Sequence, residues 1–424
     1  MAADDTLAAR AATRIWSLYV GLGLLALGTG LQGTLVGVRT QIEGFSDGVT
    51  GVVMAAYYAG FLAGSFVAPR IVLRVGHIRV FAGLASGASI AALVYSLSAS
   101  ALTYGAMRLL TGVCLAGLYV VAESWINTEA TNTTRGRLLG LYMVTLMGGA
   151  AIGQFLLNVD DPASFELFVF SSVLISLALL PVSLAQSPAP QFAVQTPTGL
   201  RTLMRRSPLG AVGGVLTGAS TGAILGMGAV YATRAGLDTT EITLFMAAAL
   251  AGGMAFQLPI GRLSDRLPRR RVILATSLAA TGVALAAVAI PPDTPLMILA
   301  ALGYGGLAFT MYSLSISLIN DLTPPDEFVG SAAVFLFLSG IGAIAGPMIA
   351  AAAIASLGPE GYWWSLAAFY APVAVLAVWR IVSQSRLGPA IRLASPIYRP
   401  TPVLGHVIEE APVAVSPPET PAAH

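Results

Sequence analysis

Charge is scarce in this chain, and that scarcity excludes most soluble folds. Charged residues make up 10% of the 424 residues, hydrophobic residues make up 56%, and the mean hydropathy is +0.79. Soluble domains are about one quarter charged, so a soluble protein of this length could not cover its surface with so few charges. The composition predicts an integral membrane protein.

Cysteine is nearly absent, and metal-binding patterns are missing. The single Cys114 lies in an apolar run, so no disulfide framework can form. His77 and His406 have no companions that would complete a metal site. Residues 1–16 ("MAADDTLAARAATRIW") contain acids and no short apolar core before a cleavage site, so we expect no cleavable signal peptide.

Enzyme signatures are missing too. The spaced glycines of "GLGLLALGTG" (residues 21–30) lie within a long apolar segment rather than after a strand, which argues against a dinucleotide site. The chain has no P-loop pattern. We therefore expect no enzyme, no cofactor and no nucleic-acid partner, and we expect energy from a gradient rather than from ATP.

Long apolar runs, rich in Gly and Ala, dominate what is present. A membrane-spanning helix needs about 20 mostly apolar residues, and small residues let such helices approach closely. The sequence predicts twelve spans, which are residues 14–37, 48–69, 79–98, 101–126, 137–158, 164–184, 208–232, 240–261, 271–290, 295–319, 328–353 and 361–382.

The pattern of apolar runs is broken once in the middle and again at the end. Residues 185–207 are rich in Pro, Gln and Arg, which predicts a cytoplasmic linker between two six-helix halves, 1–184 and 208–382. Residues 383–424 form a Pro-rich polar tail that we expect to be disordered and cytoplasmic.

The arginines indicate the orientation. All 22 basic residues are Arg, and with both termini in the cytoplasm all but Arg39, Arg108 and Arg234 fall on the cytoplasmic side. The predicted outer loops carry acids instead: Glu43, Asp47, Asp160, Asp161, Glu166, Asp238, Glu241, Asp293 and Glu360. We therefore expect a multi-pass protein with both termini in the cytoplasm.

The two halves also repeat each other. A shift of 193 residues places Gly112 on Gly305, and with it Tyr119 on Tyr312, Gly149 on Gly342 and Gly153 on Gly346. A shift of 192 places Arg74 on Arg266, together with Arg70 on Arg262 and Arg79 on Arg271. Two similar halves related by an axis along the membrane normal are a known plan of transporters.

The stretch "GRLSDRLPRRR" (residues 261–271) holds five of the arginines. With Gly261, Asp265 and Arg266 it resembles the loop signature of the major facilitator superfamily, Gly-x-Leu-x-Asp-Arg-x-Gly-Arg-Arg, but departs from it at Pro268. The resemblance implies an all-α integral membrane fold, with twelve transmembrane helices in two pseudo-symmetric six-helix bundles.

Other stretches extend this resemblance across residues 14–382. The first-half counterpart, "PRIVLRVGHIR", keeps Arg74 and Gly76 but has Leu73 at the Asp position. "RLLTGVCLAG" is similar to the family's second motif, and "RLLTGVCLAGLYVVAESWIN" is similar to the YcaD-like subgroup of bacterial exporters. The antiporter signature Gly-Pro-x-x-Gly-Gly is degraded to "GGAAIG" (residues 148–153), and a partial version is "GIGAIAGP" (residues 340–347).

Asp265 and Arg266 are candidates for a gate. A carboxylate at a helix end can accept hydrogen bonds from the free amides at the N-terminus of a neighbouring helix, and arginines can pair with it or with anionic lipid. Such a clasp, with Arg74 in the other half, would hold the cytoplasmic side shut. The alternative, a simple topology signal, is the favoured interpretation for Arg269, Arg270 and Arg271.

Arg108 is the ionisable residue that lies plainly at membrane depth, where such groups usually face a cavity or a partner. At about 100° per residue, Tyr119 and Glu123 fall near the same helix face. Arg108 cannot release its proton, so it would attract an anionic group or tune a carboxylate. Glu123 could carry a coupling proton, or it could pair with Arg74.

Five further polar residues are candidates for a central cavity, although each could instead make a helix–helix hydrogen bond. They are Gln32, Gln154, Gln257, Tyr304 and Tyr312. Such a pocket has few fixed charges and favours uncharged, amphipathic or singly charged solutes.

We expect a monomeric secondary transporter in a bacterial inner membrane, in contact with lipid and moving a small organic solute by alternating access. Proton-coupled efflux is the preferred function. Facilitated uptake or uniport is one alternative, and a non-transporting receptor or scaffold on the same fold is another.

Overall fold

The described residues form twelve helices that are long and apolar enough to cross a membrane. The computed structural model describes residues 16–131, 134–183, 199–324 and 327–385. The prediction of twelve spans is therefore confirmed. The spans are α2 (Trp16–Ile42), α3 (Asp47–Val75), α4 (His77–Val94), α5 (Ala101–Glu129), α6 (Arg135–Phe155) with η1 (Leu156–Asn158), α7 (Glu166–Leu177) with α8 (Leu179–Ser183), α10 (Pro208–Arg234), α11 (Thr239–Arg266), α12 (Arg269–Ala287), α13 (Pro295–Asn320), α14 (Phe328–Leu357) and α15 (Gly361–Ser385).

Parts of three other predictions lie outside the described residues. These parts are the N-terminal stretch through residue 15, linker residues 185–198 and tail residues 386–424. The described end of the linker contains a short helix, α9 (Leu200–Arg206).

The two motif stretches are more helical than the sequence suggested. Helix α3 continues to Val75 and ends at Gly76, whose φ of 93° is a conformation that side chains disfavour. Helix α11 continues to Arg266 and ends where Leu267, extended as residues before proline usually are, precedes Pro268. Gly261, Asp265 and Arg266 therefore lie on the last turns of a helix rather than in a loop.

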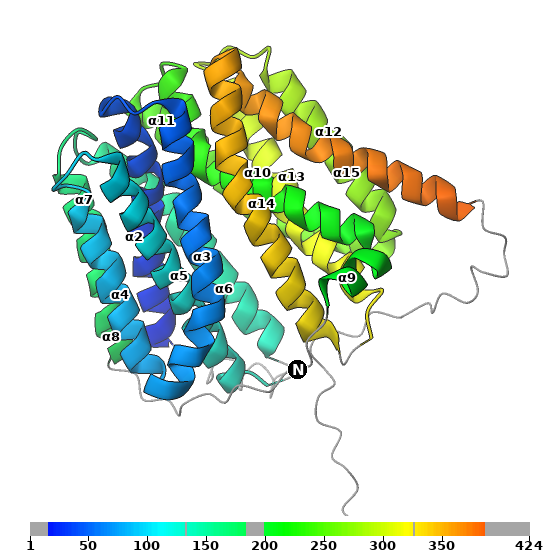
Figure 1. The fold of residues 1–424 in the computed structure, drawn as a ribbon, viewed down its shortest axis with the longest axis horizontal. Helices are drawn as coiled ribbons and strands as arrows, with labels where there is room; N and C mark the ends of the chain where they lie inside the picture. The colour runs from blue at the N-terminus through cyan, green and yellow to red at the C-terminus, as the bar shows by residue number, and fades with distance from the viewer. Residues whose placement is uncertain (1–15, 132–133, 184–198, 325–326, 386–424) are drawn as a thin grey trace, which may run out of the picture.

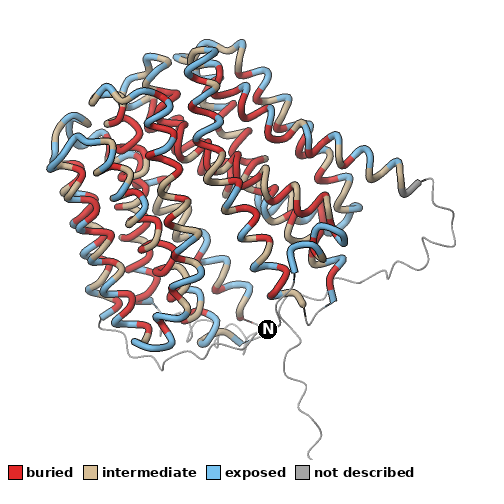
Figure 2. The backbone as a smooth tube through the Cα atoms, in the orientation of Figure 1, coloured by how far each residue is buried: buried red, intermediate tan, exposed pale blue. Residues whose placement is uncertain are grey.

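Helices α2–α8 form one bundle and α10–α15 form the other, side by side in Figure 1. In the first bundle α3 packs on α5 and α2 packs on α6; in the second, α11 packs on α13 and α10 packs on α14. The buried residues concentrate inside and between the bundles, and exposed residues cover the loops and outward faces (Figure 2). Many of the exposed outward residues are large and apolar, such as Leu102 and Val375, as a surface that faces lipid requires.

Glycines at equivalent positions make the equivalent helix crossings. A β-carbon on Gly112 of α5 would collide with the carbonyl oxygen of Tyr57 on α3, and one on Gly305 of α13 would collide with that of Ala249 on α11. The same correspondence holds for the other crossing, which pairs Gly153 with Leu27 and Gly346 with Ala219. The sequence repeat is therefore a repeat of backbone-to-backbone contacts.

The two bundles together have two chemically different ends. The loops that join α2 to α3, α6 to α7 and α10 to α11 lie at one end and carry acids, so we call it the acidic end. The loops that join α3 to α4 and α11 to α12 lie at the other end, which we call the arginine-rich end.

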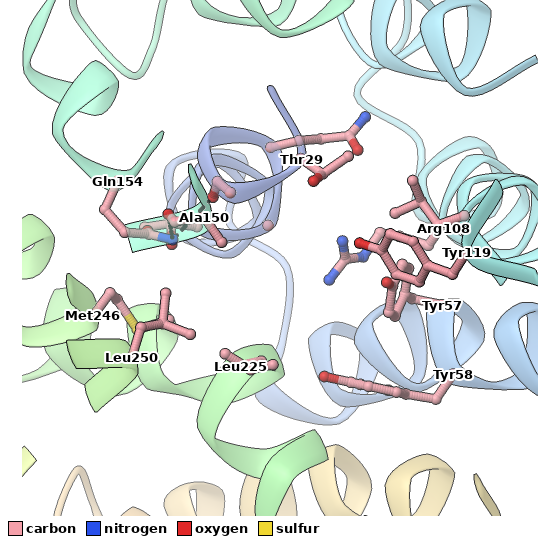
Figure 3. A pocket seen from close by; sticks show the side chains of 15 residues that line it. Thr29, Tyr57, Tyr58, Arg108, Tyr119, Ala150, Gln154, Leu225, Met246 and Leu250 are labelled. Carbon is pink, nitrogen blue, oxygen red and sulfur yellow. Dashed lines mark hydrogen bonds between the residues drawn. The ribbon is translucent and has the colours of Figure 1, made fainter. Parts of the chain in front are cut away.

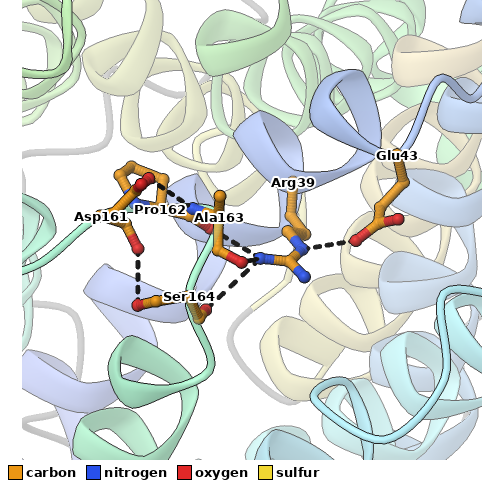
Figure 4. Close-up of polar contacts among 6 residues, drawn as sticks. All are labelled: Arg39, Glu43, Asp161, Pro162, Ala163 and Ser164. Atoms are coloured by element: carbon orange, nitrogen blue, oxygen red, sulfur yellow. Dashed lines mark hydrogen bonds and ion pairs between the residues drawn. The ribbon is translucent and has the colours of Figure 1, made fainter.

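At the acidic end a network around Arg39 holds the first bundle together (Figure 4). The Arg39 guanidinium pairs with Glu43 at 2.7 Å and donates to the carbonyl oxygens of Pro162 and Ala163 in the α6–α7 loop. The end of α2 is thereby tied to a loop more than one hundred residues away in the chain.

The two bundles are joined at the acidic end. Arg234 of α10 pairs with Asp47 of α3, with Nε–Oδ1 and Nη2–Oδ2 distances of 3.1 and 2.5 Å. Asn158 of η1 donates to Thr243 and accepts from Thr240, both on α11. These four hydrogen bonds join the first bundle directly to the second.

Toward the arginine-rich end, α3 and α14 diverge (Figure 1). Leu62 lies against Gly340, and one turn further along α3 the rings of Phe66 and Phe337 still approach to 6.2 Å between centroids. Glu123 and Tyr312, which lie in the halves of their helices nearer this end, are exposed. The structure is thus a conformation closed at the acidic end and separated at the other.

Candidate functional site

A cavity of about 150 Å³ lies between the two bundles, near the middle of the helices. Helices α2, α3, α5 and α6 of the first bundle contribute twelve of its fifteen lining residues, including all the polar ones (Figure 3). Helices α10 and α11 contribute Leu225, Met246 and Leu250. One wall is therefore polar and belongs to the first bundle, and the opposite wall is apolar.

Arg108 supplies the charge in this cavity. Its side chain is on α5, is 4% exposed and points toward the cavity centre in Figure 3. Its contacts are weak: Nη2 lies 3.0 Å from the sulfur of Met54, and Cζ lies 5.0 Å from the ring centroid of Tyr57. Its Nε has no hydrogen-bond partner among the described residues, and no carboxylate there forms an ion pair with it.

These contacts do not compensate the burial of the charge. A cation over an aromatic ring gains about 0.5–2 kcal/mol, and a thioether sulfur is a weak acceptor. Taking a charge out of water costs several kcal/mol even after the protein relaxes. The described residues therefore leave the Arg108 charge, between the two bundles, without a compensating anion.

Several hydrogen-bond donors share the cavity with Arg108. The Gln32 side-chain amide is buried, and its Nε2 has no partner in the described part of the chain. Tyr57, Tyr58 and Tyr119 also line the cavity, and in Figure 3 the rings of Tyr57 and Tyr119 lie beside the guanidinium. The polar wall is thus rich in groups that can donate to an anion.

Gln154 faces the same cavity but already has partners. Its Nε2 donates to the carbonyl oxygens of Gly30 at 3.1 Å and Ala150 at 3.2 Å, and its Oε1 accepts from Thr34. It therefore links α2 to α6, which is the helix–helix role that the sequence left open for it.

Glu123 lies outside the cavity, further along α5 toward the arginine-rich end. Its carboxylate accepts a hydrogen bond from Tyr142 of α6 at 3.2 Å, and it has no ion pair with Arg74 in this conformation. Tyr312 of the other bundle is close enough to Glu123 to interact electrostatically and packs its ring edge on Phe335. The carboxylate therefore lies where the two bundles separate.

Three of the five residues predicted for the central cavity lie elsewhere: Tyr312, which is near Glu123, and Tyr304 and Gln257. Tyr304 is buried within the second bundle, where its hydroxyl bonds Ser220 at 2.9 Å and donates to the Leu366 carbonyl at 3.1 Å. Gln257 is exposed and donates to Ser313 at 2.9 Å. Both make hydrogen bonds between helices instead of lining the cavity.

The predicted clasp at the arginine-rich end is not formed in this conformation. Asp265 is 62% exposed and has Arg269 at 3.8 Å, and it accepts no hydrogen bond from a helix N-terminus among the described residues. Arg269, interpreted from the sequence as a topology signal, instead pairs with Asp321 at 2.6 Å and donates to Ser264. Arg74 and Arg266 make no ion pair with a described residue, so the gate stays a prediction for a state closed at this end.

Tyr57, Tyr58, Thr29 and Thr34 also line the cavity, and sequence reasoning missed them. The adjacent tyrosines of "AAYYAG" were a usable signal, because two hydroxyl-bearing rings in the middle of an apolar span need partners or a cavity. The threonines gave none, since Thr29 bonds the Leu25 carbonyl of its own helix as threonines in any spanning helix do.

Comparisons with known proteins agree with this architecture. The Major Facilitator Superfamily matches residues 18–255 and 210–403. The uncharacterized transporter YcaD of Escherichia fergusonii is 26% identical over 343 residues, which is 79% of this chain and 87% of that protein. The uncharacterized transporter YE1530 of Yersinia enterocolitica is 28% identical over 338 residues, which is 78% of this chain and 86% of that protein.

Solved structures share the fold at lower sequence identity. A crystal structure of a nucleoside transporter NupG mutant has a TM-score of 0.74 and 14% identity, covering 86% of this chain and 98% of that one. A bacterial homolog of the lysosomal transporter Spinster, in an inward-facing and unoccupied conformation, has a TM-score of 0.68 and 17% identity, covering 89% and 99%. The chain belongs to the Major Facilitator Superfamily.

Proposed function

We propose that this transporter moves a small organic solute by alternating access, and that it exports the solute from a bacterial cytoplasm in exchange for protons. The observation that carries the proposal is the cavity at the interface of two bundles that are bonded at one end and separated at the other. A site placed between two such bodies can be exposed to either side in turn when they rock.

The arrangement of charge supports the orientation. With the arginine-rich end in the cytoplasm, the chain follows the positive-inside rule, and the present conformation is open to the cytoplasm. Opening to the outside then requires the Asp47–Arg234 pair and the Asn158 hydrogen bonds to break. A few such bonds suit a reversible transition, because alternative states must differ by only a few kcal/mol.

Glu123 is the group that we propose carries the proton. It is a titratable residue on the same helix as Arg108, and Tyr142 donates a hydrogen bond to it near the opening between the bundles. Arg108 itself cannot fill this role, since a guanidinium keeps its proton in proteins.

The first experiment is a growth screen. An efflux-deficient bacterial strain with and without this chain is exposed to a panel of toxic compounds and of single carbon sources. Export predicts resistance to at least one compound, whereas uptake predicts growth on a carbon source. The solute found in this way is then used in the reconstituted system.

The second experiment tests coupling. Purified protein in liposomes that contain a pH-sensitive dye should show solute-dependent proton movement. Glu123→Gln should abolish that movement, whereas Glu129→Gln, which removes a carboxylate from the same helix, should retain it. Solute movement at the wild-type rate without proton flux would contradict coupling.

Uniport is the second candidate, and a specific feature favours it. The antiporter signature expected on α6 lacks its proline in "GGAAIG", so the motif gives exchange only partial support. The dye experiment separates the two, because a uniporter moves solute down its gradient with no change in internal pH.

A further inference from the structure

We propose that the cavity binds a small organic monoanion, with a carboxylate group on the solute completing the ion pair that Arg108 lacks. This inference rests on the proposed transport function, and it names the class of solute. Four observations carry it: the unpaired guanidinium, the absence of acids in the walls, the unpartnered Gln32 amide in the same cavity and the apolar surface opposite.

The guanidinium has room for an anion. Arg108 is 4% exposed, and its polar contacts are the sulfur of Met54 and the ring face of Tyr57, neither of which is an oxygen acceptor. Its Nε is buried and has no partner among the described residues. Buried charges in proteins are normally paired, so this one indicates a partner that arrives from outside.

The protein does not supply that partner from the helices around the cavity. Helices α2, α6 and α10 contain no Asp or Glu. The acids of α11 lie near its two ends, where Glu241 forms the capping box with the first turn and Asp265 is exposed. The acid in α3 is Asp47, which is paired with Arg234 at the acidic end. On α5 the nearest acid is Glu123, which lies about 22 Å along the helix axis at 1.5 Å per residue.

The neighbouring groups complete a donor-rich site. Gln32 presents a buried Nε2 without a partner, and Tyr58 and Tyr119 line the same wall as Arg108. A guanidinium presents parallel N–H groups that match the two oxygens of a carboxylate. With one positive charge in the cavity, a singly charged anion is neutralised and a polyanion is not.

The apolar wall restricts the rest of the solute. Leu225, Met246 and Leu250 face the polar wall across a cavity of about 150 Å³. Nothing in these three side chains can pair with a second charge or a row of hydroxyls. The geometry therefore fits a compact carboxylate with an apolar or aromatic body, and it rejects cations.

The test uses matched acids and amides on the purified full chain. The probes are benzoate, phenylacetate and cyclohexanecarboxylate, each compared with its own amide, and benzylamine as a cation. Thermal unfolding and isothermal titration are measured near neutral pH, where the acids are ionised. At least one acid should raise the unfolding temperature and bind at least about tenfold more tightly than its amide, and benzylamine should not bind.

Variants connect the effect to the residue. Arg108→Gln should weaken binding of that acid by at least about tenfold. Arg108→Lys should weaken it less, because lysine keeps the positive charge but lacks the parallel N–H groups of the guanidinium. Arg79→Gln, which changes an exposed arginine at the arginine-rich end, is the matched control and should bind as wild type does. Equal stabilisation by every acid and its amide, or binding that survives Arg108→Gln, would overturn the proposal. The wild-type comparison decides the question even if a variant does not fold.

Transport separates this inference from the function on which it rests. If an acid binds through Arg108 but is not moved across reconstituted liposomes, the anion site stands and the transport proposal fails. If the protein moves a neutral or cationic solute at the same rate with Arg108→Gln, transport stands and the anion site is refuted.

Discussion

The Asp47–Arg234 pair is predicted to act as the latch between the bundles at the acidic end. The Asp47 side chain is 6% exposed and that of Arg234 is 47% exposed, and two hydrogen bonds join them. Buried charge-assisted hydrogen bonds contribute about 1.5–3 kcal/mol, whereas exposed ion pairs contribute about 0–1 kcal/mol. Because Arg234 is half in water, we expect the pair to stabilise the closed acidic end by about 1–2 kcal/mol. Removing the pair should then shift the equilibrium about 5–30-fold toward the state open at the acidic end.

The two single variants should differ. Asp47→Asn leaves a guanidinium that water already reaches. Arg234→Gln leaves a nearly buried carboxylate without its cation, which costs more, although the N-terminus of α3 offsets part of that cost. Arg234→Gln should therefore open the acidic end further than Asp47→Asn does.

Distances between spin labels on Ile42→Cys and Leu357→Cys measure this opening, because both positions are exposed at the acidic ends of different bundles. Cys114 is buried and should take little label. The exchange Asp47→Arg with Arg234→Asp should restore much of the short-distance population. If both single variants keep the wild-type distance distribution, the pair is not a latch.

Three further outcomes follow from contacts in the structure. Gly305→Ala should lower the free energy of unfolding of the purified protein by about 1–3 kcal/mol, because the added β-carbon meets backbone on α11. Gly303→Ala on the same helix adds a β-carbon that meets nothing within 4 Å, so it should be neutral or stabilising. Equal effects of the two variants would refute the close crossing of α13 and α11. Arg108→Leu should raise the unfolding temperature of the solute-free protein while abolishing transport, since it removes an uncompensated buried charge; a clear drop in that temperature would mean that the guanidinium is satisfied. Arg269→Gln should destabilise the second bundle by about 1 kcal/mol in denaturation and leave the spin-label distances unchanged, because its partner Asp321 lies in the same bundle; a shift in those distances would show that it contributes to the gate.

Much of the fold could be predicted because lipid imposes simple rules on sequence. Apolar length marked every span, and the offset between the halves marked crossings such as Gly112 and Gly305, where the absence of a side chain is required by contact with backbone. The apolar pattern predicts ends for α3 and α11 that are several residues too early, because the last turns of both helices carry arginines and resemble loop sequence. The actual breaks are a positive φ at Gly76 and the proline after Leu267.

The site could be predicted only in part. Arg108 could be identified because a charged residue at membrane depth is costly and usually faces a cavity or a partner. Tyr119 followed from helical periodicity. Tyr304 has the same chemistry as Tyr119, but its helix turns it toward Leu366 of its own bundle. Leu225 is indistinguishable in sequence from a core residue, since only the packing of the two bundles makes it a cavity wall.

The arginines that break the charge rule proved informative. Arg39 holds the α6–α7 loop, Arg234 joins the bundles and Arg108 faces the cavity. Arg39 and Arg234 lie at the acidic end and Arg108 lies within the span of α5, and each has a local contact or a cavity that accounts for its position.

The unequal walls of the cavity have a consequence for how such a protein diversifies. Every polar lining group belongs to helices that end before residue 184, and the later helices offer only Leu225, Met246 and Leu250. A chimera that keeps the first half and takes its second half from a relative should inherit the solute preference of the first. Substitutions in the first half can then change solute selectivity, while the second half is constrained by its role in the movement of the two bundles.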